Sequence, residues 1–198
     1  MIKRLFIICI AAFMSGCAAM LVPETSDPRE KLHWAAELID KQQRPLPAEK
    51  LIREAIEICE NTNDFSCLGQ AHVTYGFFFR SDALNKWEQF YRKNGFMDKK
   101  ADLDSRYTVS IEYFKKGIEY YKKTNEYDAL TNAYLNLGFG YYFSGDHKME
   151  CEPYRKSLES YQLNIQNNPD ANPVLPKGYS SFEAYIQEQK QRAGCKQA

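Results

Sequence analysis

The sequence contains no long apolar run, no excess of charge of one sign and few histidines. Its longest apolar segment covers ten residues, from Leu5 to Met14. That is too short for a helix that crosses a bilayer, because such a helix needs about 20 apolar residues. The 26 basic and 26 acidic residues balance one another and are interspersed. This balance argues against nucleic acid as a partner, because nucleic acid requires a basic stripe.

Motifs for common catalytic chemistry are also missing. The chain has no glycine-rich phosphate loop, no serine in a strand-to-helix elbow and no His-Glu-x-x-His motif. Carboxylates are frequent, but they lie among lysines on faces that we expect to be solvated. His33 and His72 are best explained as packed or partly exposed residues in helical seams. We therefore predict that the chain is not an enzyme, with no catalytic residue and no cofactor.

The first seventeen residues have the features of an export signal. Two basic residues are followed by the ten-residue apolar run and then by small residues. The segment Met14-Ser15-Gly16-Cys17 resembles the lipobox of bacterial lipoproteins, with methionine in place of the usual leucine. The resemblance implies cleavage before Cys17, lipidation of this cysteine and anchoring by several acyl chains. The alternative is an ordinary secreted protein with an unrelated cysteine at this point.

The residue after the cysteine is Ala18, whereas an aspartate at this position favours retention in the inner membrane of enteric bacteria. The lipoprotein resemblance therefore implies the outer membrane, with the protein facing the periplasm. We expect residues 1–16 to be the signal peptide, residues 17–26 a tether and residues 27–198 a single helical domain.

Helical periodicity dominates the chain from residue 27 onward. Apolar residues recur at intervals of three and four in successive stretches, no stretch alternates with period two, and proline, glycine and asparagine lie between the stretches. Asp27, Pro28 and Glu30 indicate a helix start. Aspartate can cap free amides, proline tolerates the first helical position, and glutamate can reach back to the cap. The sequence predicts an all-α fold.

Shifting the sequence by 62 residues aligns Gly76 with Gly138 and Ala71 with Ala133, which indicates an internal repeat. The chain resembles the tetratricopeptide repeat (TPR) at Tyr134, Leu137, Gly138, Tyr141, Tyr154 and Ser157. The resemblance implies a TPR-like α-solenoid made of helical hairpins. Its units would cover about residues 31–60, 65–123 and 127–168, and a capping helix would cover about residues 181–193.

The second unit is longer than the family pattern. Gly76 and Gly117 are 41 residues apart, whereas the corresponding Gly138 and Ser157 are 19 apart, a surplus of 22. Divided between two helices, this surplus adds about three turns to each. We therefore predict one elongated helical hairpin over residues 80–106. The alternative is a short extra helix followed by a loop.

The third unit and the last helix carry their own signals. Pro153 falls inside the second helix of the third unit, where it would kink that helix or delay its start. Ser180 and Glu183 suggest a capping box for the last helix, which would end at Gly194.

Four cysteines lie beyond the lipobox, and an even number in an exported chain favours disulfides. Four cysteines allow three pairings. Cys59 and Cys67 flank a turn between two predicted helices and can meet there, which leaves Cys151 to pair with Cys195. Metal binding is the alternative, because His147 and Cys151 are four residues apart, but further ligands at suitable spacing are missing. We expect no metal site.

In the TPR family, the first helix of each pair lines a concave groove. The resemblance implies a partner-binding groove formed by Gln70, Phe77, Arg80, Asn132, Asn136, Phe139 and Tyr142. Val73 and Leu135 stand where family members that clamp a peptide carboxylate have a cation, so we do not expect that clamp. Trp87 and Tyr91 of the predicted hairpin are expected to form an exposed anchor for a partner.

These features together predict a lipid-anchored, periplasm-facing protein that binds a protein or peptide partner as a scaffold or adaptor. The alternative is an immunity lipoprotein that neutralises a toxin acting in the periplasm.

Overall fold

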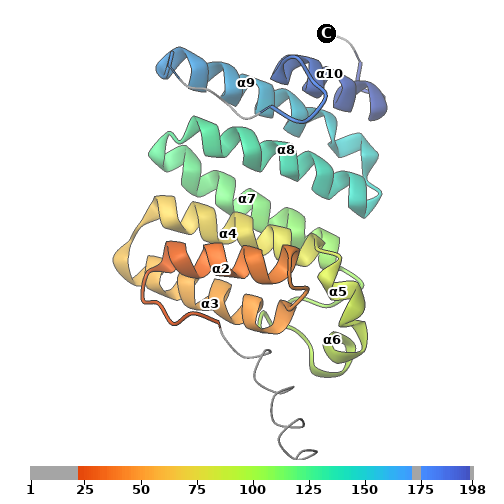
Figure 1. The fold of residues 1–198 in the computed structure, drawn as a ribbon. Helices are drawn as coiled ribbons and strands as arrows, with labels where there is room; N and C mark the ends of the chain where they lie inside the picture. The colour runs from red at the N-terminus through yellow and green to blue at the C-terminus, as the bar shows by residue number, and fades with distance from the viewer. Residues whose placement is uncertain (1–21, 171–174, 197–198) are drawn as a thin grey trace, which may run out of the picture.

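The computed structural model describes residues 22–170 and 175–196, and this part of the chain contains helices and no strand (Figure 1). The predicted all-α class is confirmed. The longer helices are α2 (Pro28–Asp40), α3 (Pro45–Thr62), α4 (Phe65–Arg80), α7 (Arg106–Thr124), α8 (Tyr127–Ser144), α9 (Cys151–Asn167) and α10 (Phe182–Arg192). The short segments are α5 (Ala83–Lys86), α6 (Glu88–Asn94) and the 3₁₀ turn η2 (His147–Met149). Cys17 and the predicted signal peptide lie outside the described residues.

The longer helices pack against one another in chain order (Figure 1). Helix α2 contacts α3 and α4, and the contacts continue from α4 to α7, from α7 to α8, from α8 to α9 and from α9 to α10. One apolar core around Ile52 and Phe79 joins α2, α3 and α4. A second core around Phe114 and Leu137 joins α4, α7 and α8. Within the described residues, no helix is long and apolar enough to span a membrane.

The start of α2 follows the predicted local chemistry. The Asp27 carboxylate accepts a hydrogen bond from the Arg29 amide at 2.9 Å, and Pro28 is the first residue of the helix. Glu30 does not bond back to the cap, as a capping box would require. Its carboxylate accepts instead from the Thr25 hydroxyl at 2.6 Å.

Helix α9 starts late, which is one of the two outcomes predicted from Pro153, and α10 starts one residue later than its predicted cap implied. Helix α9 begins at Cys151, so Pro153 lies in its first turn, where backbone amides have no intrahelical partner. Pro153 is therefore accommodated by a late start. The cap of α10 is Ser181 and not Ser180, because the Ser181 hydroxyl accepts from the Ala184 amide at 3.1 Å.

The segment after Arg80 does not form the predicted elongated hairpin. Helix α4 ends at Arg80, α5 and α6 follow as separate short helices, and residues 95–105 contain no helix. Gly95 ends α6 with a φ of 71°, a value that favours glycine. This arrangement matches the alternative of a short helix and a loop.

Burial of apolar side chains explains this correction. The segment folds back on the core of α2, α3 and α4, and its buried members are Ala83, Leu84, Tyr91, Phe96 and Ala101. Glu49 of α3 holds the loop, because its carboxylate accepts from the Met97 amide at 2.7 Å and from the Tyr75 hydroxyl at 2.9 Å. A projecting hairpin would have lost the burial of these side chains against the core.

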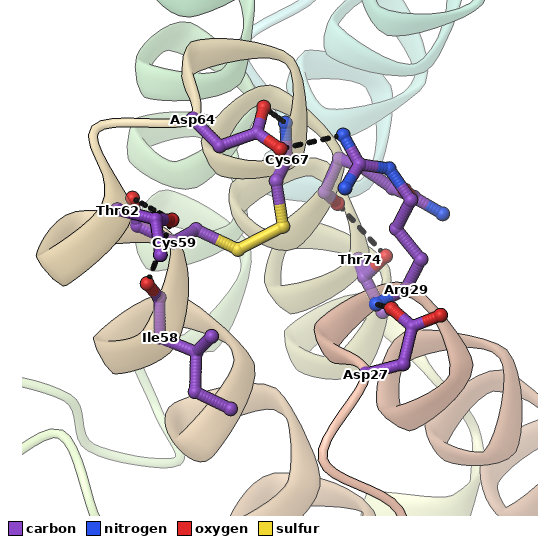
Figure 2. Close-up of a disulfide and its surroundings, with 9 residues drawn as sticks. Asp27, Arg29, Ile58, Cys59, Thr62, Asp64, Cys67 and Thr74 are labelled. Atoms are coloured by element: carbon purple, nitrogen blue, oxygen red, sulfur yellow. Dashed lines mark hydrogen bonds and ion pairs between the residues drawn. A yellow bond between two sulfur atoms is a disulfide. The ribbon is translucent and has the colours of Figure 1, made fainter.

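A disulfide fixes the corner between α3 and α4 (Figure 2). It joins Cys59 near the end of α3 to Cys67 in the first turn of α4, and both residues are fully buried. Asp64 caps α4 by accepting from the Cys67 amide at 2.9 Å, and it pairs with Arg29 of α2 at 2.8 Å. The Cys67 amide and, next, Arg29 lower the pKa of Asp64. The corner therefore ties α2, α3 and α4 together.

Glycines allow the closest helix contacts. A Cβ atom on Gly76 would lie 2.9 Å from the ring of Phe114, and a Cβ atom on Gly138 would overlap the ring of Tyr154. The Phe114 ring of α7 thus packs on the backbone of α4, and the Tyr154 ring of α9 packs on the backbone of α8.

Replacing Gly138 with alanine should lower the free energy of unfolding by about 1–3 kcal/mol, because the new methyl group would displace the buried Tyr154 ring. Gly140→Ala in the same helix is the matched control. Its methyl group would lie 3.0 Å from Ile111 Cγ1, which is a milder contact. Both changes raise helix propensity equally. Urea unfolding measures the difference, and equal stability of the two variants would contradict the prediction.

Candidate functional site

Arg80, the last residue of α4, contacts three other predicted groove residues, which are Phe77, Asn136 and Phe139. Its guanidinium donates from Nη1 to the Asn136 main-chain oxygen at 3.1 Å and from Nη2 to Asn136 Oδ1 at 2.7 Å. The Asn136 amide in turn donates to the main-chain oxygen of Asn132 at 2.9 Å and to its Oδ1 at 2.7 Å. A chain of hydrogen bonds therefore runs from α4 along α8.

Four phenylalanine rings surround the Arg80 guanidinium. The distances from Cζ to the ring centroids are 5.2 Å for Phe77, 5.4 Å for Phe114, 5.7 Å for Phe143 and 5.9 Å for Phe139. We call Arg80, Asn136 and these four rings the Arg80 cluster. Cation–π attraction to the rings stabilises the guanidinium.

The positive charge of Arg80 has no counter-ion among the described residues, because none of their carboxylates lies within ion-pair distance. Burial lowers the pKa of Arg80 to about 10, so the guanidinium stays protonated at neutral pH. Burying an uncompensated charge is costly, and neutral acceptors and rings offset only part of that cost. The cluster therefore retains a net positive charge.

Two hollows adjoin the Arg80 cluster. The α2–α4 hollow has a volume of about 570 Å³ and is lined by Ala36, Ile39, Asp40, Gln43, Thr74, Phe77, Arg80, Ser81 and Asp82. The α8–α10 hollow has a volume of about 540 Å³ and is lined by Phe139, Tyr142, Phe143, His147, Glu150, Tyr154, Gln189, Arg192 and Ala193. Both volumes lie in the range of ligand-binding sites.

The α8–α10 hollow has the more aromatic and the more exposed wall. Tyr142 is 47% exposed and Phe143 is 48% exposed. Tyr107 of α7 stacks on Phe143 with ring centroids 5.7 Å apart. Exposed aromatic groups of this kind are enriched at protein interfaces, so this wall is the strongest candidate for a partner contact.

The polar base of the α8–α10 hollow is Glu150, which is 3% exposed. Its carboxylate lies 2.6 Å from His147 Nδ1 and accepts from the Tyr154 hydroxyl at 3.2 Å. Burial and, next, the Glu150 carboxylate raise the pKa of Tyr154, so its phenol stays protonated and donates. The carboxylate is thus engaged by the protein's own groups.

Several predicted site residues do not reach these hollows. Tyr91 is 2% exposed inside the first core. Trp87 is half-buried against the same core, and its indole donates to the Gln43 main-chain oxygen at 3.0 Å. The predicted exposed anchor of Trp87 and Tyr91 is therefore wrong, because the segment that carries them folds back. Gln70 is half-buried and lines neither hollow.

Phe143, Gln189 and Arg192 were not predicted as site residues. Phe143 lies four residues after Phe139, so the helical spacing of α8 already placed it on a neighbouring surface. Gln189 and Arg192 belong to α10, and the predicted Cys151–Cys195 pairing was the one signal that placed the end of this helix beside the start of α9.

The second disulfide holds the α10 wall in place. It joins Cys151 at the start of α9 to Cys195, three residues after the end of α10. Both expected disulfides are therefore present in the structure. Helix α10 packs on α9 through Phe182 and Ile186, and its last turn lines the hollow.

The alternative of a metal ion shared by His147 and Cys151 does not fit, because the Cys151 sulfur is in a disulfide. Within residues 22–170 and 175–196, no group of three or more His, Cys, Asp or Glu side chains could hold a metal ion.

His72 is a packed residue of the seam between α4 and α7. It is 7% exposed, and its ring lies 5.4 Å from the ring of Tyr120 and 5.7 Å from that of Tyr113. Burial and, next, the positive charges of Lys116 and Arg53 lower the pKa of His72 to about 4. The imidazole is therefore neutral in the folded protein at neutral pH.

The His72 pKa predicts loss of stability in acid. The unfolded chain takes up a proton near pH 6.5 that the folded chain refuses until about pH 4, so stability falls as the pH decreases through this window. His72→Phe keeps a ring between the tyrosines and should reduce the loss between pH 7 and pH 5 by about 2 kcal/mol. Urea unfolding at several pH values measures the free energy of unfolding and hence this loss. His33→Gln, at an exposed histidine, is the control, and an equal effect there would contradict the prediction.

Reduction should distinguish the two disulfides. Cys151 and Cys195 are partly exposed, whereas Cys59 and Cys67 are 0% exposed. Dithiothreitol under native conditions should therefore cleave Cys151–Cys195 first, and trypsin should then cut α10 faster at Lys190 and Arg192. Alkylation with mass spectrometry follows both events. Cleavage of Cys59–Cys67 first, or at an equal rate, would be the opposite result.

Comparison of the chain with protein-family models, with curated proteins and with solved structures finds no match.

Proposed function

We propose that the chain is a lipid-anchored, TPR-like protein of the bacterial envelope that faces the periplasm and binds another protein as a scaffold or adaptor. The proposed anchor is Cys17, in the segment that resembles a lipobox. The two disulfides support an exported protein, because disulfides persist in oxidising compartments and are rare in the cytosol.

Equivalent contacts in two helix pairs support the TPR-like repeat, with the first-helix residues offset by 62 and the second-helix residues offset by 40. Gly76 of α4 lies under the Phe114 ring, and Gly138 of α8 lies under the Tyr154 ring. Three residues after each ring, a second contact follows. A Cβ atom on Gly117 would lie 3.0 Å from the Gly69 main-chain oxygen, and the Ser157 hydroxyl donates to the Thr131 main-chain oxygen at 2.8 Å. Gly69 and Thr131 are again 62 residues apart.

The observation that carries the binding role is the Arg80 cluster between two hollows, beside exposed aromatic side chains. Tyr142 and Phe143 are each nearly half exposed, and neither belongs to an apolar core. Phe143 contacts the rings of both Tyr107 and Tyr142, so these side chains form a contiguous aromatic patch, and such patches are typical of protein–protein contact sites. Residues of α2, α4, α8 and α10 contribute to this surface, which therefore spans much of the molecule.

Photo-crosslinking in cells tests the role. Benzoylphenylalanine in place of Tyr142 should give one dominant adduct in the envelope fraction. The matched control is the same group at Leu163 of α9, which is 40% exposed and lines neither hollow. Adduct formation only at Leu163, or equally at both positions, would contradict a partner site at Tyr142. Mass spectrometry of the adduct identifies the partner. Mass spectrometry of the N-terminal peptide tests whether Cys17 is lipidated.

A further inference from the structure

Two guanidinium groups in or beside the α8–α10 hollow have no carboxylate partner among the described residues. Arg80 lines the α2–α4 hollow and not this one, but its Cζ lies 5.9 Å and 5.7 Å from the ring centroids of Phe139 and Phe143, both of which line the α8–α10 hollow. Arg192, at the end of α10, lines the hollow itself and donates to Gln189 Oε1 at 3.3 Å. Its other donors form no ion pair with these residues.

The walls of the hollow are ring side chains in edge-to-face contact. Phe139 and Tyr154 have centroids 5.9 Å apart at an interplanar angle of 70°, and Tyr142 and Phe143 have centroids 5.4 Å apart at 78°. Such rings can accept a further ring at an offset or at an edge. A volume of about 540 Å³ has room for one aromatic side chain and the backbone beside it.

The exposed charge at the rim of the hollow is positive. Glu150 is the one carboxylate among its described lining residues, and it is 3% exposed and held by His147 and the Tyr154 hydroxyl. Arg192 is exposed at the rim, and its charge has the same sign as that of Arg80. An anionic group at the rim would therefore meet complementary charge.

We infer that the α8–α10 hollow is a socket for an aromatic side chain of the partner that lies next to a carboxylate. The ring enters between Phe139, Tyr142 and Phe143, and the carboxylate pairs with Arg192. This inference rests on the proposed partner-binding role and adds the chemistry of the docking segment. Because Arg192 comes from α10, the Cys151–Cys195 bond helps to keep the socket complete.

Ligand-observed NMR with the full chain in detergent tests the socket. The probes are N-acetyl-phenylalanine, its amide, which lacks the carboxylate, and N-acetyl-leucine, which lacks the ring. Saturation transfer should be strongest for N-acetyl-phenylalanine, and its amide should bind about fivefold more weakly, as expected for an exposed ion pair. N-acetyl-leucine should bind more weakly than the aromatic acid, because it cannot stack.

Three variants locate the binding. Arg192→Gln should make the aromatic acid and its amide bind equally, and Phe143→Ala should weaken both. Met97→Ala, at a residue that is 47% exposed and outside the hollow, should change neither. Equal binding of acid and amide to the unmodified chain, or no saturation transfer at all, would overturn the socket. The crosslink at Tyr142 is a separate readout, so a partner captured there without probe binding would leave the proposed function standing.

Discussion

The structure depends on aromatic rings that pack directly on the backbone of a neighbouring helix at glycine. Phe114 packs on Gly76 and Tyr154 packs on Gly138. At both places a single methyl group would separate two helices, because the ring is buried and cannot turn away. Tyr154 also extends beyond the contact, where its hydroxyl donates to Glu150 and its ring forms part of the α8–α10 hollow. The geometry of that hollow is therefore set by the same contact that sets the spacing of α8 and α9.

Local sequence signals predicted the elements well where the controlling interaction is itself local. Asp27 and Pro28 start α2 because a cap needs only its own first turn. The internal repeat paired Gly138 with Gly76, and both glycines contact a ring of the neighbouring helix. The segment over residues 80–106 failed for the opposite reason. The apolar residues of this segment recur at a spacing that suits long helices. They bury more apolar surface by folding back on α2, α3 and α4 than they would by projecting. That gain comes from residues distant in the chain, such as Glu49, whose carboxylate binds the Met97 amide.

The residues of the candidate site also differ in how well the sequence predicted them. Phe77, Arg80, Asn136 and Phe139 were expected in a groove because the chain resembles the TPR family, and the structure brings them together. Trp87 and Tyr91 were predicted on the exposed surface of a projecting hairpin, but that hairpin does not form and both side chains pack against the first core. Gln189 and Arg192 were missed because α10 reaches the hollow through its docking on α9 and through a disulfide that closes 44 residues. The predicted Cys151–Cys195 pairing indicated that the end of α10 lies beside the start of α9, but the sequence did not indicate which face of α10 turns toward the hollow.

The charge of Arg80 links the fold to the proposed binding surface. A carboxylate at the position of Asn136 would form an ordinary buried ion pair and cancel the charge, whereas the amide oxygen and the main-chain oxygen of Asn136 each accept one hydrogen bond and leave the charge in place. Three of the four rings that stabilise the guanidinium, Phe77, Phe139 and Phe143, also line the two hollows. The only carboxylate described at the α8–α10 hollow is meanwhile drawn into hydrogen bonds with Tyr154 and His147. The exposed charge at that hollow is therefore the charge of Arg192, and the proposed partner segment, which carries a ring next to a carboxylate, would complement it.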